Sequence, residues 1–253
     1  MRATTKTTSL LVGAALLGSA ACGADSDSGP RETKKTPSAD ATGTGTGTGS
    51  ETGQGRSGGQ ESEAGGTAKT LTKKQLDKAV LQGTVKGYKA GEVPAMDVPP
   101  QGGVSVDRAE CAPIAYLISG QLSVRPKSVT YRSLKPADLK NATVGNVWLS
   151  SYDGDGVERV IADLDKAVDQ CEKPFKVAGL TYRSVERVGS ARNARVDFRV
   201  TGDISKQNIT MNYAIVRSGN VVASFYGVNM LKPEKGLIPN SVVESQVGRL
   251  SHG

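Results

Sequence analysis

Residues 194–228 read ARVDFRVTGDISKQNITMNYAIVRSGNVVASFYGV, and this stretch decides the fold class. Apolar and polar side chains alternate along it, as they do in strands that bury one face. The alternation predicts strands over 194–201, 208–217 and 220–228, and Ser218-Gly219 joins the last two as a two-residue hairpin turn. With a further strand over 180–188, this region is predicted to be an antiparallel meander.

The strongest helical signal precedes the meander, at residues 156–170. Apolar side chains three or four positions apart form one stripe over four turns: Val157, Val160, Ile161, Leu164, Ala167, Val168 and Cys171. The preceding Asp-Gly-Asp-Gly run resembles the start of a calcium loop. Val157 and Glu158 stand where such a loop needs Asp or Asn and then Gly, so a turn leading into the helix is preferred.

Three other helices are expected. The first follows a capping box formed by Thr72 and Gln75 and ends at Gly83. The second begins at Asp107 and stops at Gly120. The last opens at Pro239 and buries its apolar side, Val242, Val243, Val247 and Leu250.

Two more strands are predicted over 124–134 and 144–152, and residues 85–98 read as an edge strand and loop. Within 144–152, Val147 and Leu149 share one face and Trp148 lies on the other. Strands and helices do not alternate strictly. The expected fold class is therefore α+β, an antiparallel β-sheet with packed helices and one disulfide.

The N-terminus has the features of an export signal over residues 1–21. Arg2 and Lys6 are followed by an uncharged segment in which SLLVGAALLGSAA is the apolar part. A membrane-spanning helix needs about 20 apolar residues, so this segment is too short to span a bilayer.

Cys22 follows that segment directly, after Gly18-Ser19-Ala20-Ala21. This ending resembles a bacterial lipobox, although Ser19 stands where Leu is usual. We therefore expect lipidation at Cys22, with palmitate among the acyl chains, which anchors the chain to the cell membrane on its extracytoplasmic face. The alternative is ordinary secretion after an A-x-A-like cleavage site.

Residues 22–68 form the expected spacer. Positions 23–68 contain no Val, Ile, Leu, Met or aromatic residue, and such a segment has nothing with which to offset the entropy of ordering. Its GTGTGTG run lacks the GK[ST] ending of a phosphate-binding loop. The spacer is predicted to be a disordered linker with a span of ~40 Å. The globular domain then covers residues 69–253.

The chemistry-bearing residues are few. With Cys22 acylated, Cys111 and Cys171 remain as an even pair, which in an oxidising compartment implies a disulfide. The only histidine is His252, at a chain end, so triads and His-ligated zinc are excluded. No metal site, nucleotide fingerprint or cofactor is expected, and the domain is predicted not to be an enzyme.

Carboxylates are the remaining candidates for acid–base chemistry. Asp153 and Asp155 flank the turn before the long helix, and Asp163 and Asp165 read as solvating charges on its exposed face. Asp197 and Asp203, near Arg199, are interpreted as an ion pair on a sheet face. A hydrolase would need two of these carboxylates in one pocket.

Charge limits the partners. Residues 69–253 hold 26 basic and 18 acidic side chains, a formal charge of +8. This charge would favour anionic envelope components such as phosphorylated wall polymers or lipid headgroups, or it serves solubility alone. No basic run interleaved with aromatic residues indicates nucleic acid.

Several segments together resemble the PknH-like extracellular domain family, the sensor domain of certain receptor kinases that also occurs on lipoproteins. They are residues 110–115 (ECAPIA), 119–120 (SG), 146–152 (NVWLSSY), 167–171 (AVDQC) and 216–222 (VRSGNVV). The resemblance implies a binding or sensing module with a ligand cleft. The kinase domains carry two disulfides, whereas only one pair is available in this chain.

Two function classes follow from the sequence. The main hypothesis is a membrane-tethered extracytoplasmic module that binds or senses an envelope ligand. The alternative is a structural or protein-interaction lipoprotein with no small ligand. A partly apolar cleft would favour the first, and a filled core with one flat apolar patch would favour the second.

Overall fold

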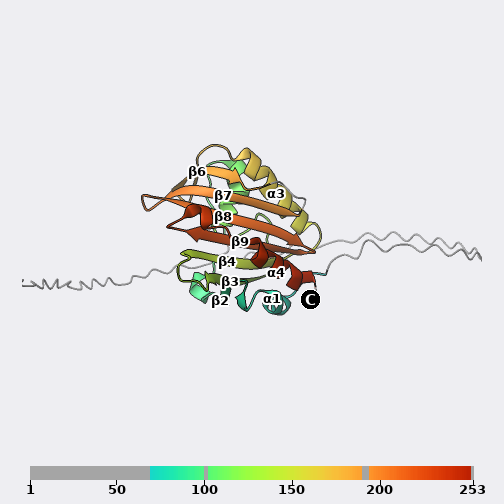
Figure 1. Ribbon diagram of the computed structural model, residues 1–253. Helices are drawn as coiled ribbons and strands as arrows, with labels where there is room; N and C mark the ends of the chain where they lie inside the picture. The colour runs from blue at the N-terminus through green and yellow to red at the C-terminus, as the bar shows by residue number, and fades with distance from the viewer. Residues whose placement is uncertain (1–68, 100–101, 190–193, 252–253) are drawn as a thin grey trace, which may run out of the picture. The chain divides into compact units, whose positions relative to one another are not determined.

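The computed structural model describes residues 69–99, 102–189 and 194–251 (Figure 1). The predicted signal peptide, Cys22, the whole predicted spacer and His252 lie outside these residues. Within the described part of the chain, no helix is both long and apolar enough to cross a membrane.

The core of the fold is a nine-stranded antiparallel sheet in the order β1-β2-β3-β4-β9-β8-β7-β6-β5. Its strands are β1 Gly83–Val85, β2 Tyr88–Glu92, β3 Ser128–Pro136, β4 Thr143–Ser151, β5 Phe175–Val177, β6 Leu180–Arg187, β7 Arg195–Ile204, β8 Gln207–Ser218 and β9 Val221–Asn229. The predicted α+β class and the predicted meander of the last four strands are both confirmed.

Two meanders meet at the centre of the sheet. Strands β1–β4 run inward from one edge and β5–β9 run inward from the other, so that β4 pairs with β9 over their whole lengths. The register runs from Thr143 opposite Asn229 to Ser151 opposite Val221. The two-residue hairpin turn between β8 and β9 consists of Gly219 and Asn220, one residue later than predicted, because Ser218 still pairs with Val221, and Gly219 adopts a φ of 56°.

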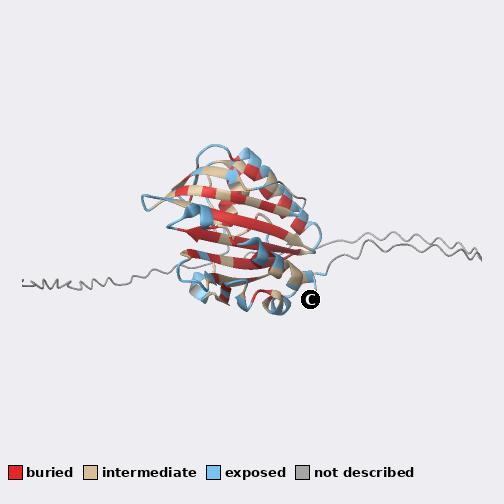
Figure 2. Cartoon of the chain, viewed as in Figure 1, coloured by how far each residue is buried: buried red, intermediate tan, exposed pale blue. Residues whose placement is uncertain are grey.

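Helices cover both faces of the sheet. On one face lie α1 (Lys73–Ala79) and α4 (Asn240–Ser251), and on the other lie α2 (Ala112–Ile118) and α3 (Gly156–Gln170). Three short 3-10 turns are η1 Ala95–Asp97, η2 Ala109–Cys111 and η3 Pro233–Lys235. As a result, the central strands are buried along most of their length, as Figure 2 shows.

The two faces separate the apolar side chains of β4 as the alternation predicts. Val147 and Leu149 belong to the core under α1 and α4, whereas Trp148 belongs to the core under α2 and α3. The bounds of α3 agree with the predicted helix at both ends. Its first residue follows Asp155, although the Asp155 side chain makes no capping hydrogen bond.

Two helix boundaries predicted from the sequence are wrong. The capping box at Thr72 and Gln75 forms, but α1 ends at Ala79 because Val80 is already extended, and Gly83 begins β1. The second helix does not begin at Asp107. The Asp107 carboxylate instead accepts the Lys176 N–H at 2.7 Å and thereby fastens β5, a strand that the sequence analysis missed.

The predicted disulfide joins Cys111 to Cys171, whose Cα atoms are 5.1 Å apart. Both residues are fully buried. Cys111 lies immediately before α2 and Cys171 ends α3, so the bridge holds together the two helices that cover one face of the sheet.

Candidate functional site

A cleft of about 260 Å³ lies between the sheet and the end of α2. The sheet contributes its floor, the last turn of α2 contributes one wall, and the segment after β2 contributes the other. We call it the aromatic cleft, and its lining residues are Val93, Asp97, Pro99, Leu117, Ile118, Ser119, Gly120, Tyr131, Asn146, Trp148, Met211, Tyr213 and Tyr226.

Strand pairing brings the aromatic rings of the cleft together. Tyr131 lies directly opposite Trp148, and Tyr213 lies opposite Tyr226. The ring centroids are 6.4 Å apart in the first pair and 5.5 Å apart in the second. Asn146 pairs with Tyr226 on the adjacent strand and adds an amide to the lining. The strand register therefore places four aromatic rings and one amide around the same space.

Two buried polar atoms, one on a lining residue of the cleft and one on the residue paired with it, lack hydrogen-bond partners among the described residues. They are the indole Nε1 of Trp148 and the hydroxyl of Ser224, which lies directly opposite Trp148 in the register. Trp148 is 5% exposed and Ser224 is fully buried. An unsatisfied buried donor typically costs about 1–3 kcal/mol, so these atoms destabilise the domain unless another group supplies a partner.

The cleft is electrically close to neutral. Burial raises the pKa of the Tyr213 and Tyr226 hydroxyls, and the neighbouring tyrosines raise it further. Both phenols therefore remain protonated at neutral pH. The lining includes one carboxylate, that of the exposed Asp97, and no basic side chain.

Gly120 shapes the rim of the cleft. Its φ is 72°, and a Cβ added there would lie 2.2 Å from the Cγ of Pro99. Glycine is therefore required both for the left-handed backbone and for the close approach of Pro99. This contact joins the end of α2 to the segment after β2.

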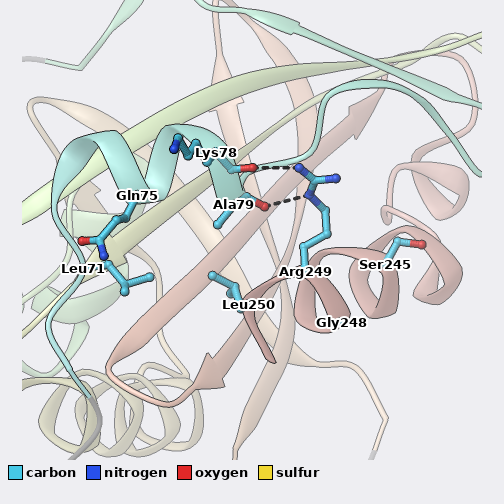
Figure 3. Close-up of a pocket in the computed structure, with 8 residues that line it drawn as sticks. All are labelled: Leu71, Gln75, Lys78, Ala79, Ser245, Gly248, Arg249 and Leu250. Atoms are coloured by element: carbon cyan, nitrogen blue, oxygen red, sulfur yellow. Dashed lines mark hydrogen bonds between the residues drawn. The ribbon is translucent and has the colours of Figure 1, made fainter. Parts of the chain in front are cut away.

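A larger groove of about 610 Å³ lies on the other face, between α1 and α4 (Figure 3). Several of its polar groups are engaged within the two helices. The Arg249 guanidinium donates to the carbonyl oxygens of Lys78 and Ala79 at 2.8 and 2.9 Å, and Gln75 completes the capping box. Nearby, the buried Gln246 accepts the Leu81 N–H and donates to the Ala79 carbonyl. We therefore interpret the groove as a packing seam between the helices.

The predicted ion pair of Asp197, Asp203 and Arg199 is wrong. Asp197 pairs with Arg195 at 2.8 Å, and Asp203 pairs with Arg183 at 2.7 Å. Arg195, Asp197, Arg199 and Asp203 all lie on the same face of β7, so alternation could not choose between the two arginines beside Asp197, and Asp203 takes its partner from the neighbouring strand β6.

The carboxylates around α3 are also engaged. Arg187 bridges Asp165 and Asp169, each at 2.7 Å, so Asp165 is more than a solvating charge. Asp163 accepts the Ser123 hydroxyl at 2.9 Å, and Asp153 pairs with Lys127. In the described residues no group of three His, Cys, Asp or Glu side chains could hold a metal ion, and no second carboxylate joins Asp97 in the aromatic cleft.

Sequence patterns did not identify the cleft residues. Cys111 and Cys171 lie in the adjacent core rather than in the cleft lining, and Cys22 is outside the described residues. The one available signal was the position of the aromatic residues. The chain has eleven of them, and four that line the cleft lie on predicted strands. Bringing them together required the order of the strands.

Comparisons with known proteins found similar solved structures, among them two from mycobacteria. The extracellular domain of PknH from Mycobacterium tuberculosis is 12% identical and has a TM-score of 0.46, over 74% of this chain and 100% of that one. The Rv0999 ortholog from Mycobacterium smegmatis is 15% identical and has a TM-score of 0.35, over 70% of this chain and 93% of that one. No family model and no curated protein matches the chain. Membership of the PknH-like family stays a prediction.

Proposed function

We propose that the chain is a lipoprotein, tethered outside the cytoplasm through Cys22, whose domain binds a neutral part of an envelope ligand in the aromatic cleft. The observation that carries this proposal is a cleft lined by four aromatic rings, one of which, Trp148, has a buried Nε1 with no hydrogen-bond partner among the described residues, as has the Ser224 hydroxyl opposite it. A ligand that supplies hydrogen-bond partners there would relieve a cost that the unliganded domain carries.

The lining selects the ligand class. Aromatic rings offer flat apolar surfaces, and the Asn146 amide, the tyrosine hydroxyls and the indole N–H offer hydrogen bonds. A sugar ring has apolar faces and polar edges that suit both. The volume of about 260 Å³ would admit one such unit rather than a long segment. An anionic group would meet Asp97 and no basic side chain.

The disulfide supports the extracytoplasmic location, because such bridges persist in oxidising compartments and are rare in the cytosol. Lipidation at Cys22 and the disordered spacer remain part of the proposal. Cys22→Ala should release the chain into the medium or leave it unprocessed, as measured by fractionation and intact mass. Retention of this variant in the membrane fraction at the mature mass would disprove the anchor.

Trp148 gives a direct test of the cleft, because it is the only tryptophan in the chain. Native mass spectrometry of the full chain purified from its own envelope should detect a bound small molecule. Adding neutral wall saccharides to the emptied protein should shift the emission of Trp148.

The matched variants are Ser119→Tyr, which fills the cleft, and Ser245→Tyr, which fills the α1–α4 groove. We expect the first to abolish ligand retention and the second to leave it unchanged. The reverse result would move the site to the groove. Retention by both variants would contradict binding at either place.

A second candidate function is a protein-interaction lipoprotein with no small ligand. The larger volume of the α1–α4 groove favours it. In that case, Trp148 emission would not respond to any saccharide, and Ser245→Tyr would abolish association with the partner.

A further inference from the structure

Two loops leave the sheet side by side at the end of strands β4 and β9. The β3–β4 loop covers residues 137–142, and the loop after β9 covers residues 230–236. Thr143 pairs with Asn229 at this end of the sheet, and the Asn229 amide donates to the Thr143 hydroxyl at 3.0 Å. The Thr143 hydroxyl in turn donates to the Lys235 carbonyl at 3.1 Å. We call these segments the loop pair.

Side-chain hydrogen bonds hold the backbone of both loops. The side-chain Oδ1 of Asn229 accepts the N–H groups of Leu231 and Lys232 at 3.0 and 2.8 Å. In the other loop, an Asp138 oxygen accepts the Lys140 N–H at 2.9 Å. Asn229 itself is only 4% exposed. The tips of the loop pair are therefore supported from within the sheet.

The loop pair exposes large apolar side chains to an unusual degree. Leu139 is 97% exposed, Leu231 is 77% exposed and Met230 is 53% exposed. Val144, at the start of β4, is 50% exposed beside them. Leu180 is the only other large apolar side chain that is exposed in the described part of the chain. Single exposed apolar residues need no explanation, but a group on two adjoining tips indicates an interaction site.

Lysines surround these tips. The two segments and their flanks contain Lys135, Lys140, Lys232 and Lys235, all exposed, against the two acids Asp138 and Glu234. None of these four lysines takes part in an ion pair with the described residues. The Asp138 carboxylate is already engaged by a backbone N–H.

We propose that the loop pair docks on an anionic lipid bilayer, with Leu139, Met230 and Leu231 inserted at the level of the headgroups. Protruding apolar tips can enter a fluid interface, and the surrounding lysines can reach the lipid phosphates. A stable protein interface, in contrast, needs about 800 Å² of complementary surface on each partner, and a pair of nearly fully exposed tips offers no such flat face.

The position of the chain entry is compatible with this docking. The folded part begins at the opposite end of β4, where the Leu71 N–H donates to the Ser151 hydroxyl at 2.8 Å. Nine residues of strand span about 30 Å, which is less than the ~40 Å root-mean-square span of the proposed spacer. A chain anchored at Cys22 could therefore still place the loop pair on the membrane. This inference goes beyond the proposed function and does not depend on the aromatic cleft.

Hydrogen–deuterium exchange of the full chain on lipid vesicles provides the test. The two vesicle types are phosphatidylglycerol mixed with phosphatidylcholine, and phosphatidylcholine alone. We expect exchange of the amides in 137–142 and 230–236 to slow about tenfold on the anionic vesicles and much less on the neutral ones. An anchor at Cys22 alone would not protect these loops selectively.

Three variants separate the contributions. Leu139→Ser combined with Leu231→Ser should abolish the protection, and Lys232→Glu combined with Lys235→Glu should abolish its dependence on anionic lipid. Leu180→Ser, which removes an exposed leucine outside the loop pair, should leave the protection unchanged.

Unprotected loops on anionic vesicles, or equal protection in the Leu139→Ser/Leu231→Ser variant, would overturn the proposal. Protection that needs a wall protein rather than lipid would overturn it too and would assign the loop pair to a protein partner. Failure of the cleft hypothesis would appear in the Trp148 emission instead, so the two proposals can fail separately.

Discussion

The aromatic cleft and the loop pair are opposite in nearly every physical property. The cleft is concave and lined by Trp148 and three tyrosines, with one carboxylate at its rim. The loop pair has a hollow of about 410 Å³ lined mostly by polar and charged side chains, and its exposed leucines are accompanied by lysines that form no ion pair with the described residues. The net charge of +8 over residues 69–253 is therefore not shared by the cleft lining, which is close to neutral. We therefore assign the expected preference for anionic components, as part of the docking proposal, to the loop pair. We do not assign it to the cleft that would bind a small ligand.

Loss of the disulfide should have the largest effect on stability. It should affect the cleft more than the loop pair. Replacing Cys111 and Cys171 with Ser should lower the free energy of unfolding by roughly 2–5 kcal/mol, out of a typical ~5–15 kcal/mol. The bridge joins α2 to α3 on the side of the cleft. Denaturant unfolding followed by Trp148 emission measures the change. An unaltered midpoint would mean that the bridge is not formed in the natural protein.

Alkaline pH should also act on the cleft more than on the loop pair. Burial raises the pKa of Tyr182, Tyr213 and Tyr226 above the ordinary value of 10.0. The folded state therefore keeps protons that the unfolded state releases, so the stabilisation is complete below about pH 10 and is lost as the pH rises further. Phenolate absorbance and circular dichroism should change together above that pH. Full ionisation of all seven tyrosines in a folded domain would contradict this prediction.

The loop pair should depend on Asn229. Asn229→Ala removes hydrogen bonds to two backbone N–H groups and to the Thr143 hydroxyl, at a cost of about 1–3 kcal/mol. We expect faster exchange of the amides in 230–236 and an unchanged Trp148 emission. Asn208→Ala, at an exposed position on β8, is the control and should change neither. Equal effects at the cleft and the loops would show that the two regions are coupled.

The smallest effect is expected at the rim of the cleft. Gly120→Ala places a Cβ in a left-handed backbone and against Pro99, which should cost about 1 kcal/mol and displace the segment after β2. Ligand retention should fall while the exchange of the loop-pair amides stays the same. Gly154→Ala also has a positive φ but open space around its Cβ, so it isolates the backbone strain from the contact with Pro99. Equal ligand retention in the two variants would show that the contact with Pro99 does not contribute to ligand binding.

Local patterns in the sequence determined much of the fold. The stripe from Val157 to Cys171 predicted α3 with its observed bounds, and alternation predicted the last four strands, β6–β9, to within a few residues. The pairing of Cys111 with Cys171 also followed, because only two cysteines were left for an oxidising compartment. These features depend on contacts between near neighbours, or on counting, and both are readable from one chain.

Tertiary structure decided the rest, because it depends on which strands become neighbours. The pairing of β4 with β9 joins two meanders that are far apart in the sequence, and no periodicity encodes that choice. This pairing places Asn146 beside Tyr226 and brings Thr143 beside Asn229. It therefore builds the floor of the aromatic cleft and the base of the loop pair at once. Covering both faces with helices likewise gave Trp148 a buried environment that alternation alone could not specify. Sequence periodicity determines which way a side chain points, whereas only the assembled sheet determines what it meets.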